Sequence, residues 1–227
     1  MDHNSYRNEY KYLITPEARI LLSRNLGRVM KRDCNALGPG YFIKSLYFDT
    51  LDDEALNDNL LGAPYREKFR IRCYNHDYDF IRLEKKVKFQ NKGYKRAAPL
   101  TKGEVSQLLD GDYTFLKGRD DELLIEFYAK LRAAVLRPKL IAGYYREPFL
   151  YRTGNVRVTL DYDLVHSSAV RAFFADETAY HREDQGKCIL EVKFDEYLPD
   201  IIRDILRGSG AMRTANSKYT TGRLITG

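Results

Sequence analysis

The sequence predicts a single α+β domain over residues 1–227, in which a mostly antiparallel sheet is accompanied by a few helices. Seven segments alternate apolar and polar residues with a period of two, which is typical of half-buried strands. Four others have helical spacing and capping residues. No Gly/Ser linker, low-complexity run or internal repeat divides the chain, and this favours one domain.

The helix signals are local and specific. Thr15 is a suitable N-cap, and Pro16 follows at the first helical position, where its missing N–H costs nothing. Thr101 and Glu104 form a capping box, and Gly208 is a typical helix stop. The predicted helices lie within residues 15–32, 101–111, 120–137 and 199–208.

The strand signals alternate between apolar side chains on one face and charged side chains on the other. The predicted strands are residues 5–14, 42–49, 66–74, 79–89, 140–150, 155–163 and 187–195. In five of them the polar face is almost entirely ionic. These ionic faces carry Arg7, Glu9 and Lys11; Lys68, Arg70 and Arg72; Arg82, Glu84, Lys86 and Lys88; Arg157, Thr159 and Asp161; and Glu191, Lys193 and Asp195.

A solvated charged face explains any single strand of this kind, but five together favour a different arrangement. Like charges on neighbouring strands repel, so a sheet that concentrates them needs a counter-anion or a metal ion. If the sheet closes into a barrel, the ionic faces line its interior and helices cover the apolar faces. Cations spaced along and across strands match a chain of phosphates, so the pattern predicts a phosphate receptor.

Composition restricts the function classes. The chain has 38 Lys and Arg against 32 Asp and Glu, a net charge of +6 that favours anionic partners. Three widely spaced cysteines, without a CxxC, favour a reducing compartment and exclude a zinc-finger pattern. The four histidines lack ligand spacing and are expected at the surface. Without an apolar leader or membrane-length stretch, we expect a cytoplasmic protein, and a membrane partner encoded elsewhere stays open.

Nine motifs in order resemble the VTC-type polyphosphate polymerase domain, a branch of the triphosphate tunnel metalloenzymes, also called the CYTH-like superfamily. The resemblance covers nearly the whole chain. The motifs are "RNEYKY" (7–12), "SLYFDT" (45–50), "KFRIRCY" (68–74), "RLEKKVKF" (82–89), "YKR" (94–96), "YYREPF" (144–149), "VRVTLD" (156–161), "ILEVKF" (189–194) and "SKY" (217–219).

The resemblance implies a closed, antiparallel eight-stranded barrel with flanking helices, whose basic tunnel binds triphosphate together with Mn²⁺ or Mg²⁺. It implies transfer of the terminal phosphoryl group of ATP to a growing inorganic polyphosphate chain. The residues assigned to catalysis are Arg70, Arg72, Lys86, Ser217 and Lys218. Those assigned to substrate binding, from the resemblance or from the ionic faces, are Lys11, Lys68, Arg82, Lys88, Lys95, Arg146, Arg157 and Lys193.

Glu191 is the expected metal ligand, with Glu84 and Glu9 as further candidates. Both further candidates could instead neutralise neighbouring lysines, and Arg157 could simply pair with Asp161 on its own strand. The hydrolytic relatives carry E-x-E-x-K on the first strand, whereas this chain has Arg7 at the first position. That departure favours holding a long anion over activating water. Ser217 and Lys218 are expected on a mobile loop or on a final strand.

Two alternatives remain open. A tripolyphosphatase or nucleoside triphosphatase would use the same tunnel and differ only in whether water or phosphate attacks. A non-catalytic module that binds polyphosphate or RNA is supported by "KKVKFQNKGYKR" (85–96), although we expect no specific nucleic acid partner.

Overall fold

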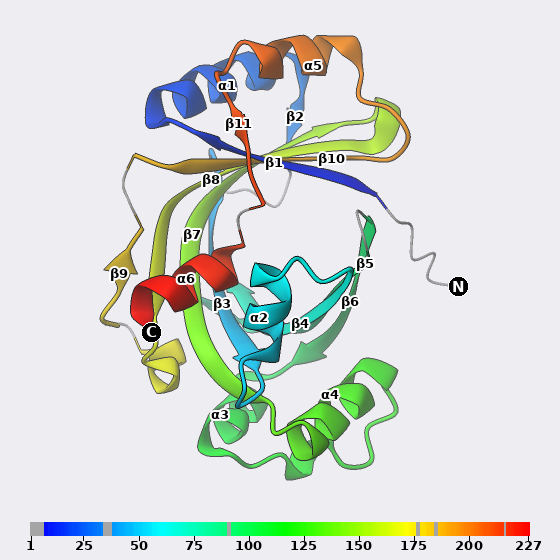
Figure 1. The fold of residues 1–227 in the computed structure, drawn as a ribbon, viewed down its shortest axis with the longest axis vertical. Coiled ribbons are helices and arrows are strands. Elements are labelled where there is room, and N and C mark those ends of the chain that lie inside the picture. Colours follow the sequence, from blue (N-terminus) through cyan, green and yellow to red (C-terminus); the bar gives the residue numbers. More distant parts are fainter. Residues whose placement is uncertain (1–6, 34–37, 90–91, 176–177, 184–185, 216) are drawn as a thin grey trace. The chain divides into compact units, whose positions relative to one another are not determined.

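Figure 1 shows a computed structural model of the chain, which describes residues 7–33, 38–89, 92–175, 178–183, 186–215 and 217–227. Two compact units are present. The first is drawn from residues 1–42, 144–164 and 182–216, and the second from residues 43–143, 165–181 and 217–227. These units are defined by their internal contacts, so the expectation that the whole chain folds as one domain stays a prediction.

The first unit contains two helices and a set of antiparallel strands. Its helices are α1 (Pro16–Val29) and α5 (Asp200–Arg207), and the strands within it are β1 (Asn8–Ile14), β2 (Lys31–Arg32), β10 (Cys188–Phe194) and β11 (Met212–Arg213). A one-turn 3₁₀ helix covers Thr153–Asn155. β1 pairs with β10 on one side and with β11 on the other.

The described part of the second unit contains a meander of strands, four α-helices and short 3₁₀ turns. Its strands are β4 (Tyr65–Tyr74), β5 (Asp77–Phe89) and β6 (Lys92–Leu100), and its helices are α2 (Glu54–Leu60), α3 (Lys102–Asp110), α4 (Glu122–Ala133) and α6 (Lys218–Thr226). The 3₁₀ turns are Thr114–Leu116 and Val170–Phe174. Strands β3 (Tyr41–Asp49), β7 (Arg137–Tyr151), β8 (Val156–Ser167) and β9 (His181–Arg182) contribute residues to both units.

Backbone hydrogen bonds order the strands as β11-β1-β10-β8-β7-β3-β4-β5-β6, with β2 on β7 and β9 on β8. Within the described residues, this eleven-stranded sheet with flanking helices agrees with the predicted α+β class, and neighbours such as β1 and β10, or β3 and β4, run antiparallel. A closed eight-stranded barrel is not confirmed, since among the described residues no hydrogen bonding joins β11 to β6. Alternation in sequence determines which way side chains face but leaves the pairing at the sheet ends undetermined.

Helices cover the apolar face of the meander in the second unit, as predicted. Phe69 and Ile71 on β4 point away from the cation row and pack with the apolar sides of α3 and α4. The ring of Phe127 on α4 lies 5.3 Å from that of Phe69. The capping box of Thr101 starts α3 and so sets where this cover begins.

The same arrangement recurs in the first unit. Val158 on β8 and Val192 on β10 pack with Leu22 and Leu26 of α1 and with Ile202 of α5. Figure 1 shows α1 and α5 side by side over one face of these strands. In each unit helices therefore cover the apolar face of the strands: α1 and α5 in the first unit, and α3 and α4 in the second.

Most predicted elements are confirmed, and the exceptions are local. Lys31 and Arg32, predicted at the end of a helix, form β2 instead. α2 and β6 were not predicted, and residues 218–226, expected as a loop or strand, form α6. Within the described part of the chain, no helix is both long and apolar enough to cross a bilayer.

Candidate anion-binding site

The cation row of β4 lies on one face of the second unit. Lys68, Arg70 and Arg72 alternate with buried Phe69 and Ile71, so the three cations share the face opposite α3 and α4. Pairing places Arg70 between Tyr47 on β3 and Glu84 on β5, and Arg72 between Ser45 and Arg82. Two neighbouring strands therefore extend this row into a surface.

Glu84 is the anionic centre of this surface. Its Oε2 lies 2.7 Å from Arg70 Nη2 and 3.8 Å from Arg72 Nη1, and its Oε1 lies 2.5 Å from Lys95 Nζ. The side chain is only 1% exposed. Burial opposes its ionisation, but the charges of Arg70, Arg72 and Lys95 outweigh this effect and hold the pKa of Glu84 far below its usual range.

The counter-anion that the like charges of this face were expected to need is therefore, for these three cations, part of the protein. The protein supplies the anion from the same face, at the position where β5 lies between β4 and β6. Net charge could not reveal this because one buried carboxylate within contact distance of three cations outweighs more distant charges. Of the two readings of Glu84, its contacts favour neutralisation, with Arg70, Arg72 and Lys95 as the partners.

Other sequence-predicted cations of this unit, on β5 and β6, extend the surface. Lys86 stands opposite Lys68 on β4 and Lys95 on β6. Lys88 stands opposite Arg66, and the guanidinium of Arg82 lies 5.5 Å from the ring centroid of Phe80. The "KKVKFQNKGYKR" segment thus contributes alternate residues to this face from β5 and β6, on either side of residues 90–91, which lie outside the description.

Tyr47 is a further candidate, which is absent from the site residues predicted from the sequence. Its hydroxyl lies 3.2 Å from Arg70 Nη1, and the residue is 5% exposed. Burial raises the pKa of Tyr47, but the positive charges of Arg70, Arg72 and Lys218 outweigh burial and lower it. Tyr47 is two residues after Ser45 on β3, so the side chains of both point to the ionic side, while Leu46 between them enters the core. This period of two was the signal in the sequence that pointed to Tyr47.

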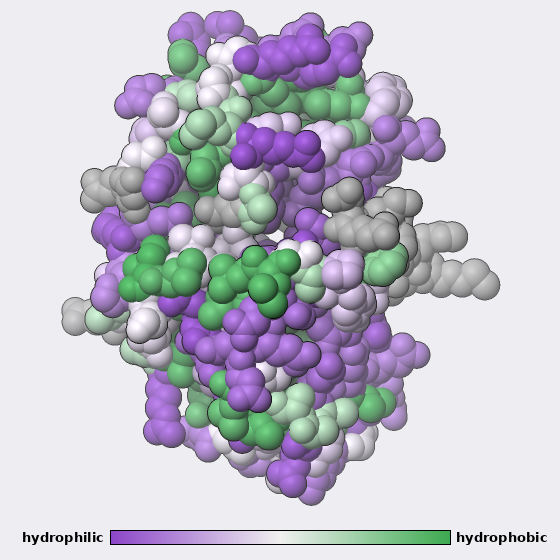
Figure 2. Space-filling view, in the orientation of Figure 1, coloured by the Kyte–Doolittle hydropathy of each residue, from purple (hydrophilic) through white to green (hydrophobic). Residues whose placement is uncertain are grey.

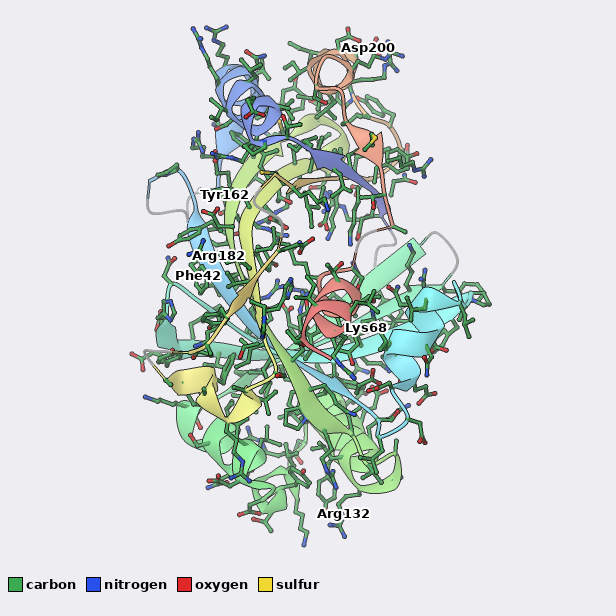
Figure 3. All side chains as sticks on the ribbon, turned by 60° about the vertical axis from the view of Figure 1, so that its left-hand side comes forward. Phe42, Lys68, Arg132, Tyr162, Arg182 and Asp200 are labelled. Atoms are coloured by element: carbon green, nitrogen blue, oxygen red, sulfur yellow. The ribbon has the colours of Figure 1, made fainter. Side chains whose placement is uncertain are left out.

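Ser217 and Lys218 join the same face through α6. Ser217 is the N-cap of this helix, and its hydroxyl accepts a hydrogen bond from Lys68 Nζ at 3.1 Å. The ammonium of Lys68 also lies 5.2 Å from the ring centroid of Tyr219. Figure 3 shows Lys68 beside the red helix α6. The sequence-predicted grouping of Ser217 with the β4 cations is thus present, although the carrier is a helix.

The ionic face of the first unit alternates in sign. Antiparallel pairing puts Lys11 opposite Glu191 and Glu9 opposite Lys193. Lys193 Nζ lies 3.0 Å from Glu191 and 3.5 Å from Glu9, and Lys11 Nζ lies 3.5 Å from Glu9 and 3.8 Å from Glu191. Two carboxylates and two ammonium groups therefore share one small area of β1 and β10.

Two arginine pairs lie on β7 and β8. Arg146 makes two hydrogen bonds to the carboxylate of Asp161, at 2.6 and 2.7 Å. Burial would lower the pKa of Arg146, but Asp161 raises it well above its usual value. Arg157 instead contacts Asp33 at 3.0 Å, so the alternative that it pairs with Asp161 is wrong. Arg157 and Asp161 are four positions apart on one strand, which is too far for their side chains to form an ion pair. Arg146 reaches Asp161 because β7 lies beside β8.

The structure thus sorts the predicted residues into two groups. The second unit holds Lys68, Arg70, Arg72, Arg82, Glu84, Lys86, Lys88, Lys95, Ser217 and Lys218. The first unit holds Glu9, Lys11, Arg146, Arg157, Glu191 and Lys193.

The carboxylates of the first unit fit a hard divalent cation. Among the described residues, no cluster of three or more His, Cys, Asp or Glu side chains forms a metal cage. Mg²⁺, however, is usually held by one or two carboxylates together with substrate phosphates. Glu9 and Glu191 share both lysines, so they lie close enough to provide such a pair. Glu84, surrounded by cations, fits that role less well.

The sequence profile of the VTC domain matches residues 6–226 of the chain. The chain belongs to the VTC domain family. The matched range includes the strands of both ionic faces and α6. Among curated proteins, no sequence match is found for this VTC-domain chain.

A solved structure shares the fold of this VTC domain. A Bacillus halodurans protein, provisionally assigned as an adenylate cyclase, has 14% identity and a TM-score of 0.59, with 94% of each chain covered. At that identity the similarity shows the fold alone. A second provisional adenylate cyclase, from Vibrio parahaemolyticus, has 12% identity and a TM-score of 0.48, covering 95% of this chain and 96% of that one. The Mimivirus capping enzyme triphosphatase has 11% identity and a TM-score of 0.39, covering 91% and 87%. The latter two similarities carry no argument.

Proposed function

We propose that this VTC-domain protein binds ATP and inorganic polyphosphate through its ionic faces and transfers the terminal phosphoryl group of ATP to the end of a polyphosphate chain. The observation that carries the proposal is the set of three cations, Arg70, Arg72 and Lys95, gathered around buried Glu84. Phosphoryl transfer requires little covalent help from protein, because positioning and charge stabilisation supply most of the catalysis. Fixed cations provide both.

In the proposed reaction the bond between the β–γ bridging oxygen and the γ-phosphorus breaks, and ADP leaves with that oxygen. A new bond forms between the γ-phosphorus and a terminal oxygen of polyphosphate. Arg70 and Arg72 bind and orient the triphosphate, and their charge stabilises the phosphoryl group as it moves. Lys86, Lys88, Arg82 and Lys68 extend the binding surface for a longer chain.

The first unit carries its own set of candidate phosphate-binding groups. Arg146 and Arg157 present guanidinium groups held by Asp161 and Asp33, and fixed guanidinium groups bind phosphate with little further ordering. Lys11 and Lys193 supply additional positive charge. Glu191 and Glu9 would hold Mn²⁺ or Mg²⁺, which when bound neutralises charge on the phosphate oxygens.

The test is to incubate purified protein with ATP and Mn²⁺ and to separate the products by gel electrophoresis. Long polymer with stoichiometric ADP supports the polymerase. Rapid release of orthophosphate without polymer would refute the polymerase and establish the hydrolase. Binding of polyphosphate without turnover would leave a binding module, and equal competition by RNA at the same phosphate concentration would argue against a dedicated phosphate-chain site.

A further inference from the structure

In the second unit, α6 is held against α2 by a set of polar contacts that the phosphate chemistry does not require. Figure 1 shows the two helices side by side, and each contact joins a residue of α6 to β3 or to the α2 region. Because α6 begins at Ser217 and Lys218, whatever positions this helix also positions two predicted site residues.

Asp49, at the end of β3, is the centre of these contacts. Its Oδ1 accepts hydrogen bonds from the backbone N–H groups of Thr50 and Ala55, at 2.8 and 2.9 Å. Its Oδ2 accepts from the N–H of Leu56 at 3.1 Å and from the hydroxyl of Tyr219 at 2.6 Å. The residue is 1% exposed. One buried carboxylate therefore ties the end of β3, the first turn of α2 and the first turn of α6.

A second set of polar contacts is made one turn further along α6, by Arg223. Arg223 makes two hydrogen bonds to the carboxylate of Asp53, at 2.7 and 2.8 Å, and donates to the hydroxyl oxygen of Tyr219 at 2.9 Å. Thr220 donates to Asn59 on α2 at 2.6 Å. Because the Tyr219 oxygen accepts from Arg223, its own hydrogen is directed to Asp49, which determines the orientation of the ring.

Close packing of α6 against Leu140 and His166 adds to these polar contacts. A Cβ at Gly222 would lie 2.5 Å from both His166 Nδ1 and Leu140 Cδ2, so only glycine allows α6 to approach this closely. His166, expected at the surface, is fully buried here. On the outer side Figure 2 shows apolar surface over α2 and α6, where Leu61 and Leu224 are 84% and 66% exposed. The position of α6 is therefore set by its polar contacts and by the close packing at Gly222, and not by the exposed side chains of Leu61 and Leu224.

We propose that Asp49 and Tyr219 are positioning residues for phosphate binding, which hold the first turn of α6 so that Ser217 lies beside Lys68 and Lys218 follows at the start of the helix. This inference rests on the proposed function of the same site. Lys68 contacts Ser217 through its ammonium group and lies over the ring of Tyr219, so a single tyrosine sets the place of three phosphate-binding groups. Removing its hydroxyl releases the ring without removing any cation.

The test is a double-mutant cycle between Tyr219→Phe and Lys218→Ala, measured as steady-state phosphoryl transfer from ATP in the full chain. We expect Tyr219→Phe to lower kcat by roughly tenfold to a hundredfold, because small misplacement of catalytic groups has effects of that size. We expect KM to change less than kcat. Since Tyr219 acts partly through Lys218, the two effects should be less than additive, and the double variant should lose less activity than the two single losses combined. Asp49→Asn should reproduce the effect of Tyr219→Phe.

Tyr113→Phe is the matched control, because it removes another tyrosine hydroxyl that lies within reach of an arginine, Arg137 Nη1 at 3.4 Å, in the same unit. It should leave kcat unchanged. Hydrogen exchange of the α6 amides gives an independent readout, and we expect at least tenfold faster exchange in Tyr219→Phe than in Tyr113→Phe. Full additivity in the cycle, or unchanged exchange in α6, would overturn the inference.

Wild-type activity distinguishes the positioning role of Tyr219 from the proposed function itself. An inactive wild-type protein that does not bind tripolyphosphate would refute the proposed function and, with it, the role of Asp49 in phosphate binding. An active wild-type protein in which Tyr219→Phe behaves like Tyr113→Phe would refute only the positioning role.

Discussion

The carboxylate of Glu84 lies 2.7 Å from the guanidinium of Arg70 on the ionic face of β4 and β5. Arg72 and Lys95 contact the same carboxylate, so one buried anion holds three cations in place. A bound phosphate chain offers more negative charge than this carboxylate and can be bound by the same groups. Glu84 therefore prearranges the cations at the cost of competing with the substrate.

Replacing Glu84 with Gln tests this arrangement, because the amide keeps the shape and removes the charge. We expect the variant to lose about 3–5 kcal/mol of unfolding free energy, as when one partner of a buried ion pair is removed. Tripolyphosphate should restore much of the loss. Melting temperatures with and without tripolyphosphate give the measurement, and Glu126→Gln on α4 is the control. An equal loss in both conditions would argue against the counter-ion role.

Tripolyphosphate should stabilise the wild-type protein. At a concentration one hundred times its dissociation constant, we expect roughly 2.7 kcal/mol of stabilisation. Lys86→Ala should melt near the wild-type temperature without ligand and lose most of the response to it. Lys130→Ala, which removes a lysine of α4 paired with Glu67, should keep the response. A wild-type response in Lys86→Ala would remove Lys86 from the site.

Asp161→Asn should destabilise the protein strongly. Asp161 is 0% exposed and carries the two hydrogen bonds from Arg146, so the variant leaves a buried guanidinium uncompensated. We expect a loss of about 3–5 kcal/mol in urea unfolding. The matched control is Asp204→Asn, which breaks an exposed pair with Arg207 and should cost less than about 1 kcal/mol. Similar losses in both variants would contradict the expected effect of burial.

Stability should fall as the pH falls below neutral, and Glu84 should account for part of the fall. Its pKa is lowered in the folded protein, because nearby cations outweigh the effect of burial. The ionised carboxylate therefore stabilises the fold above its unfolded pKa of about 4.3, and this contribution is lost as the pH drops through and below that value. Glu67 is shifted in the same direction, where Lys130 and Lys85 outweigh burial.

Urea midpoints measured between pH 7 and pH 3 check this expectation. The wild-type curve should descend more steeply than that of Glu84→Gln, which no longer has the carboxyl group to protonate. Parallel curves for the two proteins would show that Glu84 does not contribute to the acid sensitivity.

Local signals in the sequence predicted most of the fold because they act over a few residues. Thr15 and Thr101 begin helices as their side chains predict, and the alternation around Arg70 placed the cations on one face and Phe69 on the other. The helix α6 was missed because its start resembles a loop, with Ser217 as the only capping signal and Gly222 in its interior. Gly222 is explained only by its neighbours Leu140 and His166.

The sequence by itself determined which residues share a face, since the side-chain period of a strand depends only on its own backbone. It also placed the chain's motifs in an order that resembles the VTC domain, which the family profile confirms. Only the tertiary structure decided which charges meet: Glu84 with Arg70, Asp161 with Arg146, and Asp49 with Tyr219. Ion pairing depends on distances of a few ångströms between residues far apart in the chain, and strand pairing and helix packing set those distances.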